Sequence, residues 1–263
     1  QKAKLACGIA QAFFNGGQDL SIADAATKVS REIWTTMGGE VAPAYSLHWK
    51  RPLKPFRWVL HYARKHSRID APFVMLKPIA WLGDTLAGSV SRSPFRFHKP
   101  ELPLVHLSLS ELVEAIESLS RSWSLRPVYT LESLEWLLTL VSRPPRFGNL
   151  VFRGIEDEDG ELGGWFIYYR NPGGVSEVLQ LTARETLRET LLLHLFHDAM
   201  QHGVLELSGR VEPQFMQILS GNKCYIQAGR MWMLVHSEYD EITSAIQRGD
   251  SFISRLEGDL WLL

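Results

Sequence analysis

Three histidines fall on one predicted helix, and their spacing could begin a metal site. His194 and His197 are three residues apart, so they share a face of that helix, and His202 follows them. A zinc site needs a full set of ligands, and neither a cysteine nor a second acidic set lies nearby in the sequence. We therefore expect no metal, and we interpret the histidines as packed or surface residues.

The two cysteines, Cys7 and Cys224, are far apart and lack the surroundings of a catalytic nucleophile. We expect no thiol chemistry from them. They cannot build a disulfide framework, so a reducing compartment is expected, and we predict a cytoplasmic protein. No N-terminal signal pattern is visible. The chain begins abruptly inside a predicted helix, which indicates a fragment whose targeting information can be missing.

Charge is distributed unevenly along the 263 residues, although the net charge is only −1. Residues 51–100 hold 10 Lys+Arg and 2 Asp+Glu, a balance of +8, and the remainder holds 18 and 27, a balance of −9. The length suits about two ordinary domains. A basic segment therefore joins two acidic blocks.

The basic segment interleaves cations with aromatic residues: Arg57, Arg64, Lys65, Arg68, Phe56, Trp58 and Tyr62. Such a mixture suits phosphate or membrane surfaces, and the alternative is a solvated linker with a tucked aromatic face. The apolar stretch 71–82 is interrupted at Lys77 and Pro78 and is too short to span a bilayer. We read the segment as a linker with one or two short helices. It lacks any nucleic-acid-binding signature, so nucleic acid is not expected.

Hydrophobic periodicity, caps and turn residues predict the remaining elements. The predicted helices are 5–14, 25–37, 56–66, 108–122, 130–141, 183–201, 213–219 and 240–248. The predicted strands are 20–23, 41–49, 105–107, 150–155, 162–169, 175–181, 205–208, 225–235 and 252–256. Strands 150–155 and 162–169 flank an acidic turn with Asp159-Gly160 and form the clearest hairpin. The expected fold is α/β (α+β), with a mixed, mostly antiparallel sheet flanked by helices.

A pattern of helix, glycine, short strand, helix, glycine and Trp-bearing strand occurs twice, ending at Trp49 and at Trp232. The element order of residues 104–263 resembles the GNAT (Gcn5-related N-acetyltransferase) superfamily. Residues 1–50 resemble the C-terminal half of another copy. The resemblance implies a duplicated GNAT-type arrangement, with residues 51–103 as the basic linker and 104–263 as a complete second domain.

In that family, acyl-CoA lies in a V-shaped opening between the fourth and fifth strands, and backbone N–H groups of a Q/R-x-x-G-x-G/A loop hold its pyrophosphate. A helix N-terminus is suited to this because its first N–H groups are unpaired. In the first copy the loop matches residues 1–6, with Lys4 at the first glycine. In the second copy the implied cofactor-binding residues are Leu181, Thr182, Ala183, Arg184, Glu185, Thr186 and Arg188.

This second loop contains no glycine. Thr182 and Glu185 form a capping-box pattern, so the helix end can be closed by its own side chains. Glu185 would repel a pyrophosphate, whereas Arg184 and Arg188 would attract one. Two readings stay open: a modified acyl-CoA site, and an ordinary capped helix in a domain that kept the fold and lost the cofactor.

The resemblance also implies a catalytic base on the fourth strand and an acid tyrosine after the fifth. Glu177 is the candidate base, although an exposed strand glutamate is the alternative reading. Trp34 stands at the tyrosine position of the first copy, and in the second copy the frame falls near Leu219. Tyr225 and His236 are the substitute acids that we consider, with Tyr225 preferred.

Further charged residues fall where a ligand is expected. Arg210 lies just after the predicted central strand 205–208, and Asp24 has the matching place in the first copy; open α/β sheets bind ligands at such ends. Glu257 and Asp259 lie in a turn near the last predicted strand. Either could contact an amine substrate, and a solvated turn is the alternative.

The expected function is acyl-CoA-dependent N-acyltransfer, with acetyl-CoA or another acyl-CoA as co-substrate and a small-molecule or peptide amine as acceptor. The amine would attack the thioester directly, so catalysis would rest mainly on proximity. The alternative is a catalytically degenerate GNAT-fold binding or interaction module. A peripheral membrane contact through residues 51–100 and a homodimer are further partner hypotheses.

Overall fold

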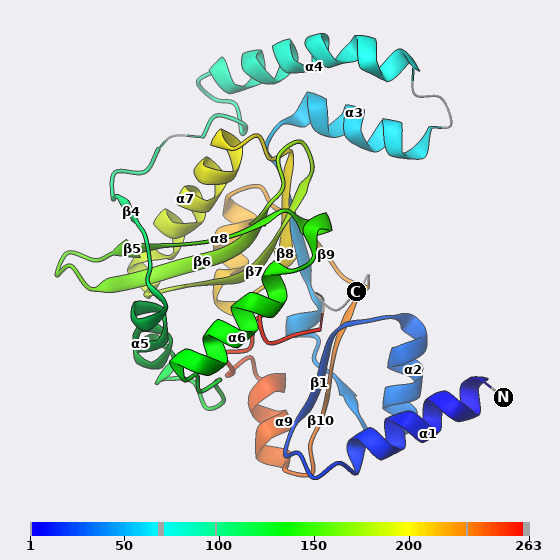
Figure 1. Ribbon diagram of the computed structural model, residues 1–263. Helices are drawn as coiled ribbons and strands as arrows, with labels where there is room; N and C mark the ends of the chain where they lie inside the picture. The colour runs from blue at the N-terminus through cyan, green and yellow to red at the C-terminus, as the bar shows by residue number, and fades with distance from the viewer. Residues whose placement is uncertain (1, 68–70, 98, 230, 260–263) are drawn as a thin grey trace.

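The computed structural model describes residues 2–67, 71–97, 99–229 and 231–259. Of residues 2–7, 71–74 and 145 it describes the backbone alone, so the side chain of Cys7 and most of the first loop motif lie outside the description, as do Gln1 and Arg68. The chain forms two sheets, which Figure 1 shows one above the other.

The large sheet has seven strands in the order β4-β5-β6-β7-β8-β3-β9. Only the β7–β8 pair is parallel. The strands are β4 (Leu104–Val105), β5 (Asn149–Glu156), β6 (Leu162–Arg170), β7 (Val175–Ala183), β8 (Glu206–Arg210), β3 (His48–Pro52) and β9 (Tyr225–Gln227). This is the predicted mixed, mostly antiparallel sheet.

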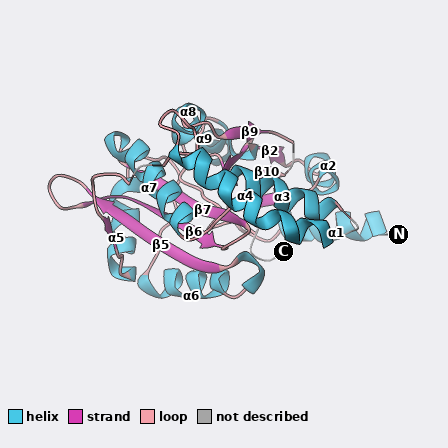
Figure 2. Ribbon diagram, turned by 90° about the horizontal axis from the view of Figure 1, so that it is seen from above, coloured by secondary structure: helices cyan, strands magenta, loops and turns pink. Residues whose placement is uncertain are grey.

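Helices cover both faces of the large sheet (Figure 2). One core joins α7 (Arg188–Gln201) and α8 (Met216–Gly221) to β3, β7 and β8, and the other joins α5 (Leu109–Ser120) and α6 (Leu131–Ser142) to β6. The predicted capping box of α5 is confirmed, because Ser108 and Glu111 cap each other's backbone N–H groups. The fold class is therefore confirmed: an α/β protein with a mixed sheet between two helical layers.

The small sheet has the order β1-β10-β2, from strands β1 (Ser21–Ala26), β10 (Trp232–His236) and β2 (Glu40–Val41). Its helices are α1 (Lys2–Phe14), α2 (Lys28–Thr36) and α9 (Asp240–Gln247). Phe14 stacks on the His236 ring with 4.0 Å between ring centroids, and Trp34 donates to the Val235 carbonyl. These contacts fix α1 and α2 against the central strand β10.

Each sheet receives one strand from the other end of the chain. The order helix, strand, helix, strand, strand recurs as α1-β1-α2-β2-β3 and as α7-β8-α8-β9-β10. The last strand of each set leaves its own sheet: β3 lies between β8 and β9, and β10 lies between β1 and β2. All four of these pairings are antiparallel. The two recurring units are thus interlocked by exchanged strands.

Two predicted strands are each divided between the two sheets, so the single-strand predictions are wrong. Residues 41–49 form the end of β2, a 3₁₀ turn at Ala44–Ser46 and the start of β3. Residues 225–235 form β9 and β10, and Gly229 between them has φ 79°, a left-handed conformation suited to glycine. Both divisions occur where the chain passes from one sheet to the other.

The predicted strand at 252–256 is also wrong. Just before it, Ser251 makes a single β-bridge, to Leu125, residues 252–254 have no regular structure, and residues 255–259 form bends. Their apolar side chains nevertheless enter the cores: Phe252 and Leu256 on the α5–α6 side of the large sheet, and Ile253 in the small-sheet core. All residues from Ser251 to Leu256 are therefore buried without a ladder of strand hydrogen bonds.

The middle of the chain forms two antiparallel helices, α3 (Pro55–His66) and α4 (Ala71–Ser89), at one end of the molecule (Figure 1). The predicted helix at 56–66 is confirmed. The expectation of short helices is wrong for α4, which has 19 residues and continues through Pro78. No helix in the described part of the chain is long and apolar enough to cross a membrane.

Candidate functional site

The neighbouring parallel strands β7 and β8 are paired along only part of their length. They pair from Val175 and Glu206 as far as Val178 and Gly209. A shift in the β6–β7 register follows directly, between the partners of Val178 and Gln180. A bulge of this kind bends a strand and breaks its pairing. We call the gap between β7 beyond Val178 and β8 beyond Gly209 "the opening".

Buried side chains fill the opening. Trp49, Phe215 and Leu219 are at most 1% exposed and line it, and the empty space left is about 10 Å³. A Cβ atom on Gly209 would lie 3.1 Å from the Trp49 indole nitrogen, so this glycine permits the close approach of Trp49. Such a space is close to the minimum for one water molecule.

The residues predicted to hold a cofactor are distributed over a strand, a turn and a helix start. Leu181, Thr182 and Ala183 belong to β7, a 3₁₀ turn spans Glu185–Leu187, and α7 begins only at Arg188. The predicted capping box is wrong, because the Thr182 hydroxyl accepts from Gln214 instead (3.3 Å). Neither the turn nor α7 has a side-chain cap.

The charged residues of this loop point to different neighbours. Arg184 pairs with Asp157 and, at 3.4 Å, with Glu161, both in the β5–β6 turn. Glu185 and Thr186 are exposed. Arg188, the first residue of α7, has a buried Nε without a hydrogen-bond partner. Arg188 is thus a cation at an uncapped helix start, while the charge of Arg184 is already matched.

Glu177 and Tyr225, predicted as the catalytic pair, stand in one row across the sheet. Glu177 is opposite Ser208, Ser208 is opposite Lys50, and Lys50 is opposite Tyr225. Three strand spacings, about 14 Å, therefore separate their backbones. Tyr225 is 68% exposed, whereas the Glu177 side chain is largely buried. The geometry does not bring the two side chains to one reacting atom.

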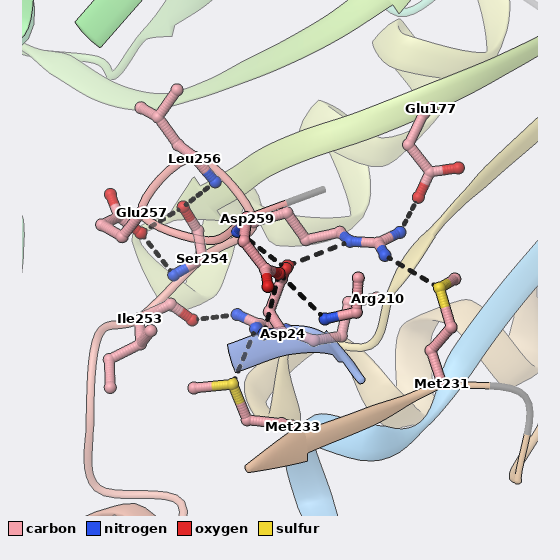
Figure 3. Close-up of polar contacts among 12 residues, drawn as sticks. Asp24, Glu177, Arg210, Met231, Met233, Ile253, Ser254, Leu256, Glu257 and Asp259 are labelled. Atoms are coloured by element: carbon pink, nitrogen blue, oxygen red, sulfur yellow. Dashed lines mark hydrogen bonds and ion pairs between the residues drawn. The ribbon is translucent and has the colours of Figure 1, made fainter. Parts of the chain in front are cut away.

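A group of charged side chains lies where the two sheets meet residues 251–259, which we call the last segment (Figure 3). We call it the junction cluster: Asp24, Glu177, Arg210, Glu212, Arg255, Glu257 and Asp259. Arg255 is 1% exposed and pairs with Asp24 of β1 and Glu177 of β7. Its backbone N–H donates to the carbonyl of Leu179 at 2.9 Å, at the edge of the opening. The last segment thus joins both sheets.

Asp24 and Asp259 share hydrogen bonds in both directions. One Asp259 oxygen accepts from the Asp24 and Ala25 amides at 3.1 Å each, and Asp24 accepts from the Asp259 amide at 3.0 Å. Burial and the Asp24 carboxylate raise the pKa of Asp259 to about 6. Burial opposes ionisation of Asp24, but the bonds from Asp259 and the nearby guanidinium groups hold its pKa below the ordinary value.

Glu212 is a carboxyl group that the sequence reasoning missed. It follows β8 beside Arg210, with 3.6 Å between Oε1 and Nη2, and it lines the opening. Burial raises its pKa to about 7, although Arg210 opposes the shift. The signal available in the sequence was its place two residues beyond Arg210, at the end of a central strand. A carboxyl group of this pKa can take or give a proton near neutral pH.

Glu257 does not lie in a solvated turn. It accepts from the Ser254 amide and hydroxyl, both at 2.6 Å, and from the hydroxyl of Tyr129. Gln180 donates to it at 3.4 Å. Glu257 is therefore bound inside the fold, and its role in the structure is to hold the last segment against β7.

Burial shifts the pKa values of His194, His197 and Cys224 away from the charged form of each side chain. His194 is 2% exposed, and burial lowers its pKa and that of His197, so both favour the neutral form. Burial raises the pKa of Cys224 to about 12, which disfavours a thiolate. Within the described ranges, no group of three or more His, Cys, Asp or Glu side chains is arranged to hold a metal ion.

Several solved structures are similar to this chain. A conserved protein from Enterococcus faecalis, described as a probable N-acyltransferase, has a TM-score of 0.48 and 10% identity, over 89% of this chain and 48% of its own. A GCN5-related N-acetyltransferase from Anabaena variabilis has a TM-score of 0.49 and 12% identity, over 88% and 49%. A Saccharomyces cerevisiae N-myristoyltransferase with bound myristoyl-CoA has a TM-score of 0.44 and 11% identity, over 73% and 48%.

The chain spans about half the length of these solved structures. No protein-family model and no curated protein matches the sequence.

Proposed function

We propose that this chain carries the acyl-transfer half of an N-acyltransferase, moving an acyl group from acyl-CoA to an amine. The observation that carries the proposal is Glu212, a carboxyl group with a pKa of about 7 at the edge of the opening between β7 and β8. In the family that the sequence resembles, acyl-CoA lies between the corresponding strands. An acetyl group is the acyl group that we expect.

Glu212 acts in this proposal as the base that removes a proton from the attacking amine. An amine attacks the thioester carbonyl, a C–N bond forms, the C–S bond breaks, and CoA leaves as a thiolate that takes a proton from solvent. The attacking nitrogen must lose a proton to Glu212, whose pKa near neutrality suits a general base. Glu177 is less suited, because Arg255 and Ser208 already occupy its oxygens.

The start of α7 supports the placement of the CoA pyrophosphate. It has no side-chain cap, and Arg188 brings a cation to its first turn. The positive end of the helix dipole favours a phosphate there, although the Arg188 amide itself donates to the Glu185 carbonyl. Arg184 is less available, because Asp157 and Glu161 neutralise it.

The packed opening favours a second function. With Trp49, Phe215 and Leu219 in place, the space of about 10 Å³ cannot hold a pantetheine arm. Acyl-CoA binding therefore requires these side chains to move. If they stay, the chain is a catalytically degenerate module that binds a ligand or partner through another surface.

Titration calorimetry with CoA and acetyl-CoA separates the two functions. Under the acyltransferase proposal we expect saturable CoA binding that weakens in Arg188→Gln and persists in Glu212→Gln. The matched control for charge is Arg121→Gln, an exposed arginine that directly follows α5. An intact chain that binds neither compound would exclude the acyltransferase and leave the binding module.

Turnover tests the role of Glu212. Release of CoA thiol in the presence of a panel of amines is expected to rise with pH through about 7, following ionisation of Glu212. Glu212→Gln should lose this rise and most of the rate, while Glu158→Gln, an exposed hairpin position, should behave as the parent protein. An unchanged rate in Glu212→Gln would assign the base to another group.

A further inference from the structure

The hairpin of α3 and α4 carries a set of exposed apolar side chains. Residues 75, 79, 82 and 86 recur at three- and four-residue spacing, so they share one face of α4. The exposed apolar residues of the hairpin are Phe56, Val59, Met75, Leu76, Ile79, Trp81, Leu82 and Leu86, each between 43% and 81% exposed. We call seven of these residues, all except Trp81, the apolar face, because Trp81 lines a groove shared with Gly173 and Leu205. Exposed apolar surface of this kind marks a site that contacts a protein or a membrane.

Polar contacts hold the hairpin so that the apolar face points outward. Asp84 of α4 accepts from the Phe56 amide at 2.8 Å and from Arg57 Nε at 2.6 Å, which joins the two helices. On the inner side of α3, Trp58 and Tyr62 donate to Glu206, a fully buried residue of β8. Trp58 and Tyr62 therefore attach α3 to the large sheet. The side chains of the apolar face stay exposed to solvent in the described part of the chain.

An apolar groove and a cationic groove flank the contact between the two helices. The apolar groove has a volume of about 490 Å³ and is lined by residues such as Phe56, Val59, Leu76 and Ile79. The cationic groove has a volume of about 500 Å³ and lies between the hairpin and the large sheet, because Gly173 and Leu205 line it together with Arg57, Arg64 and Lys77. The hairpin therefore carries an apolar groove of its own and cations that border the large sheet.

The two helices carry a net positive charge. Helices α3 and α4 contain four cations, Arg57, Arg64, Lys65 and Lys77, and one acid, Asp84, which gives 4 − 1 = +3. Asp84 is buried and paired with Arg57, so α3 and α4 present no exposed carboxylate. A protein partner would need a matching acidic apolar groove, whereas an anionic bilayer offers both properties over an extended surface.

We propose that the α3–α4 hairpin docks on the surface of a bilayer that contains anionic lipids. The apolar face enters the boundary between headgroups and acyl chains, and Lys77 and Lys65 meet the lipid phosphates. Amphipathic helices with apolar and cationic sides bind bilayer surfaces in this way, and each cation near an anionic surface adds to the attraction. Long cationic side chains can reach the headgroups while their stems stay in apolar surroundings.

Sedimentation with vesicles tests the proposal on the full chain. Vesicles of phosphatidylcholine with phosphatidylglycerol should pellet the protein, and vesicles of phosphatidylcholine alone should pellet much less. Raising the salt concentration should release the protein, because the cationic part of the attraction is screened. The charge reversals Lys65→Glu and Lys77→Glu together should weaken binding by roughly an order of magnitude or more.

The apolar contribution is tested with Leu82→Asp and Leu86→Asp in one chain, which should lower partitioning at least tenfold. The matched control is Val29→Asp with Val128→Asp, two exposed apolar residues elsewhere with the same change of charge. Circular dichroism verifies that both variants fold. Binding that survives the hairpin variant, or its absence in the parent protein, would overturn the proposal. A concentration-dependent dimer that the hairpin variant abolishes, without vesicle binding, would assign the face to a second copy.

Discussion

Asp24 and Asp259 accept hydrogen bonds from each other's backbone amides, although 235 residues separate them in the sequence. This mutual contact attaches the last segment to β1 of the small sheet. Gly258 stands directly above the pair, and a Cβ atom on it would lie 2.3 Å from the Asp24 carboxyl carbon. The junction cluster therefore depends on a residue without a side chain.

The first prediction concerns Gly258. Gly258→Ala should lower the free energy of unfolding by roughly 1–3 kcal/mol, because the new methyl group must displace the buried Asp24 carboxylate. Urea unfolding followed by circular dichroism measures the change. Gly221→Ala is the control, since a Cβ atom there meets nothing within 4 Å. Equal stability of the two variants would mean that the close contact is absent in solution.

The second prediction is a pH dependence caused by Glu212. In the unfolded chain its carboxyl group ionises near its ordinary pKa of 4.5, whereas in the folded chain the pKa is about 7. Between these values the folded state binds more protons, so stability falls as the pH rises, by roughly 3 kcal/mol in total. Glu212→Gln should match the parent protein near pH 4 and exceed its stability near pH 8. Parallel pH curves for the two proteins would contradict this assignment.

The third prediction concerns Arg255. Arg255→Met should cost roughly 3–5 kcal/mol of unfolding free energy, because Asp24 and Glu177 would lose the buried cation between them. Adding Glu177→Gln should recover part of the loss, which a double-mutant cycle measures as a positive coupling. Arg121→Met is the control, an exposed partner of Glu117 whose removal should cost little. Additive losses would indicate that Arg255 and Glu177 do not interact.

The fourth prediction separates the two residues chosen from the sequence as a catalytic pair. Tyr225→Phe should change neither stability nor CoA binding, because Tyr225 is 68% exposed and about three strands away from Glu177. Glu177→Gln should lower the melting temperature through the loss of Arg255 pairing. A loss of turnover in Tyr225→Phe, with CoA binding intact, would indicate that Tyr225 takes part in the reaction.

Local signals predicted the elements well and the pairing of distant elements poorly. The Ser108 capping box and the Asp159-Gly160 turn depend on neighbours within a few residues, and the structure has both α5 and the hairpin there. Whether β3 pairs with β8 or with β2 depends on residues more than 150 positions away, which alternation alone does not report. The same limit applies to Phe252 and Leu256, which are buried as strand residues would be although they form no strand.

The candidate site was likewise predictable from the sequence only in part. Glu177, Asp24 and Arg210 were recognisable as charged residues on strands. Arg255 and Glu212 acquire their importance only from burial beside those residues. The predicted cap at Thr182 failed because β7 continues two residues past the predicted end, which places the hydroxyl opposite Gln214.

The exchange of β3 and β10 has a consequence for biosynthesis. Strands β1 and β2 have no direct ladder with each other and meet only through β10, at residues 232–236. Strand β10 is synthesised about 190 residues after β2, so β1 and β2 keep unpaired edges until residues 232–236 have emerged. Open edges invite pairing with other chains. Truncation before residue 232 should therefore yield aggregation of the N-terminal segment, because β1 and β2 then lack the exchanged strand that pairs with both of them.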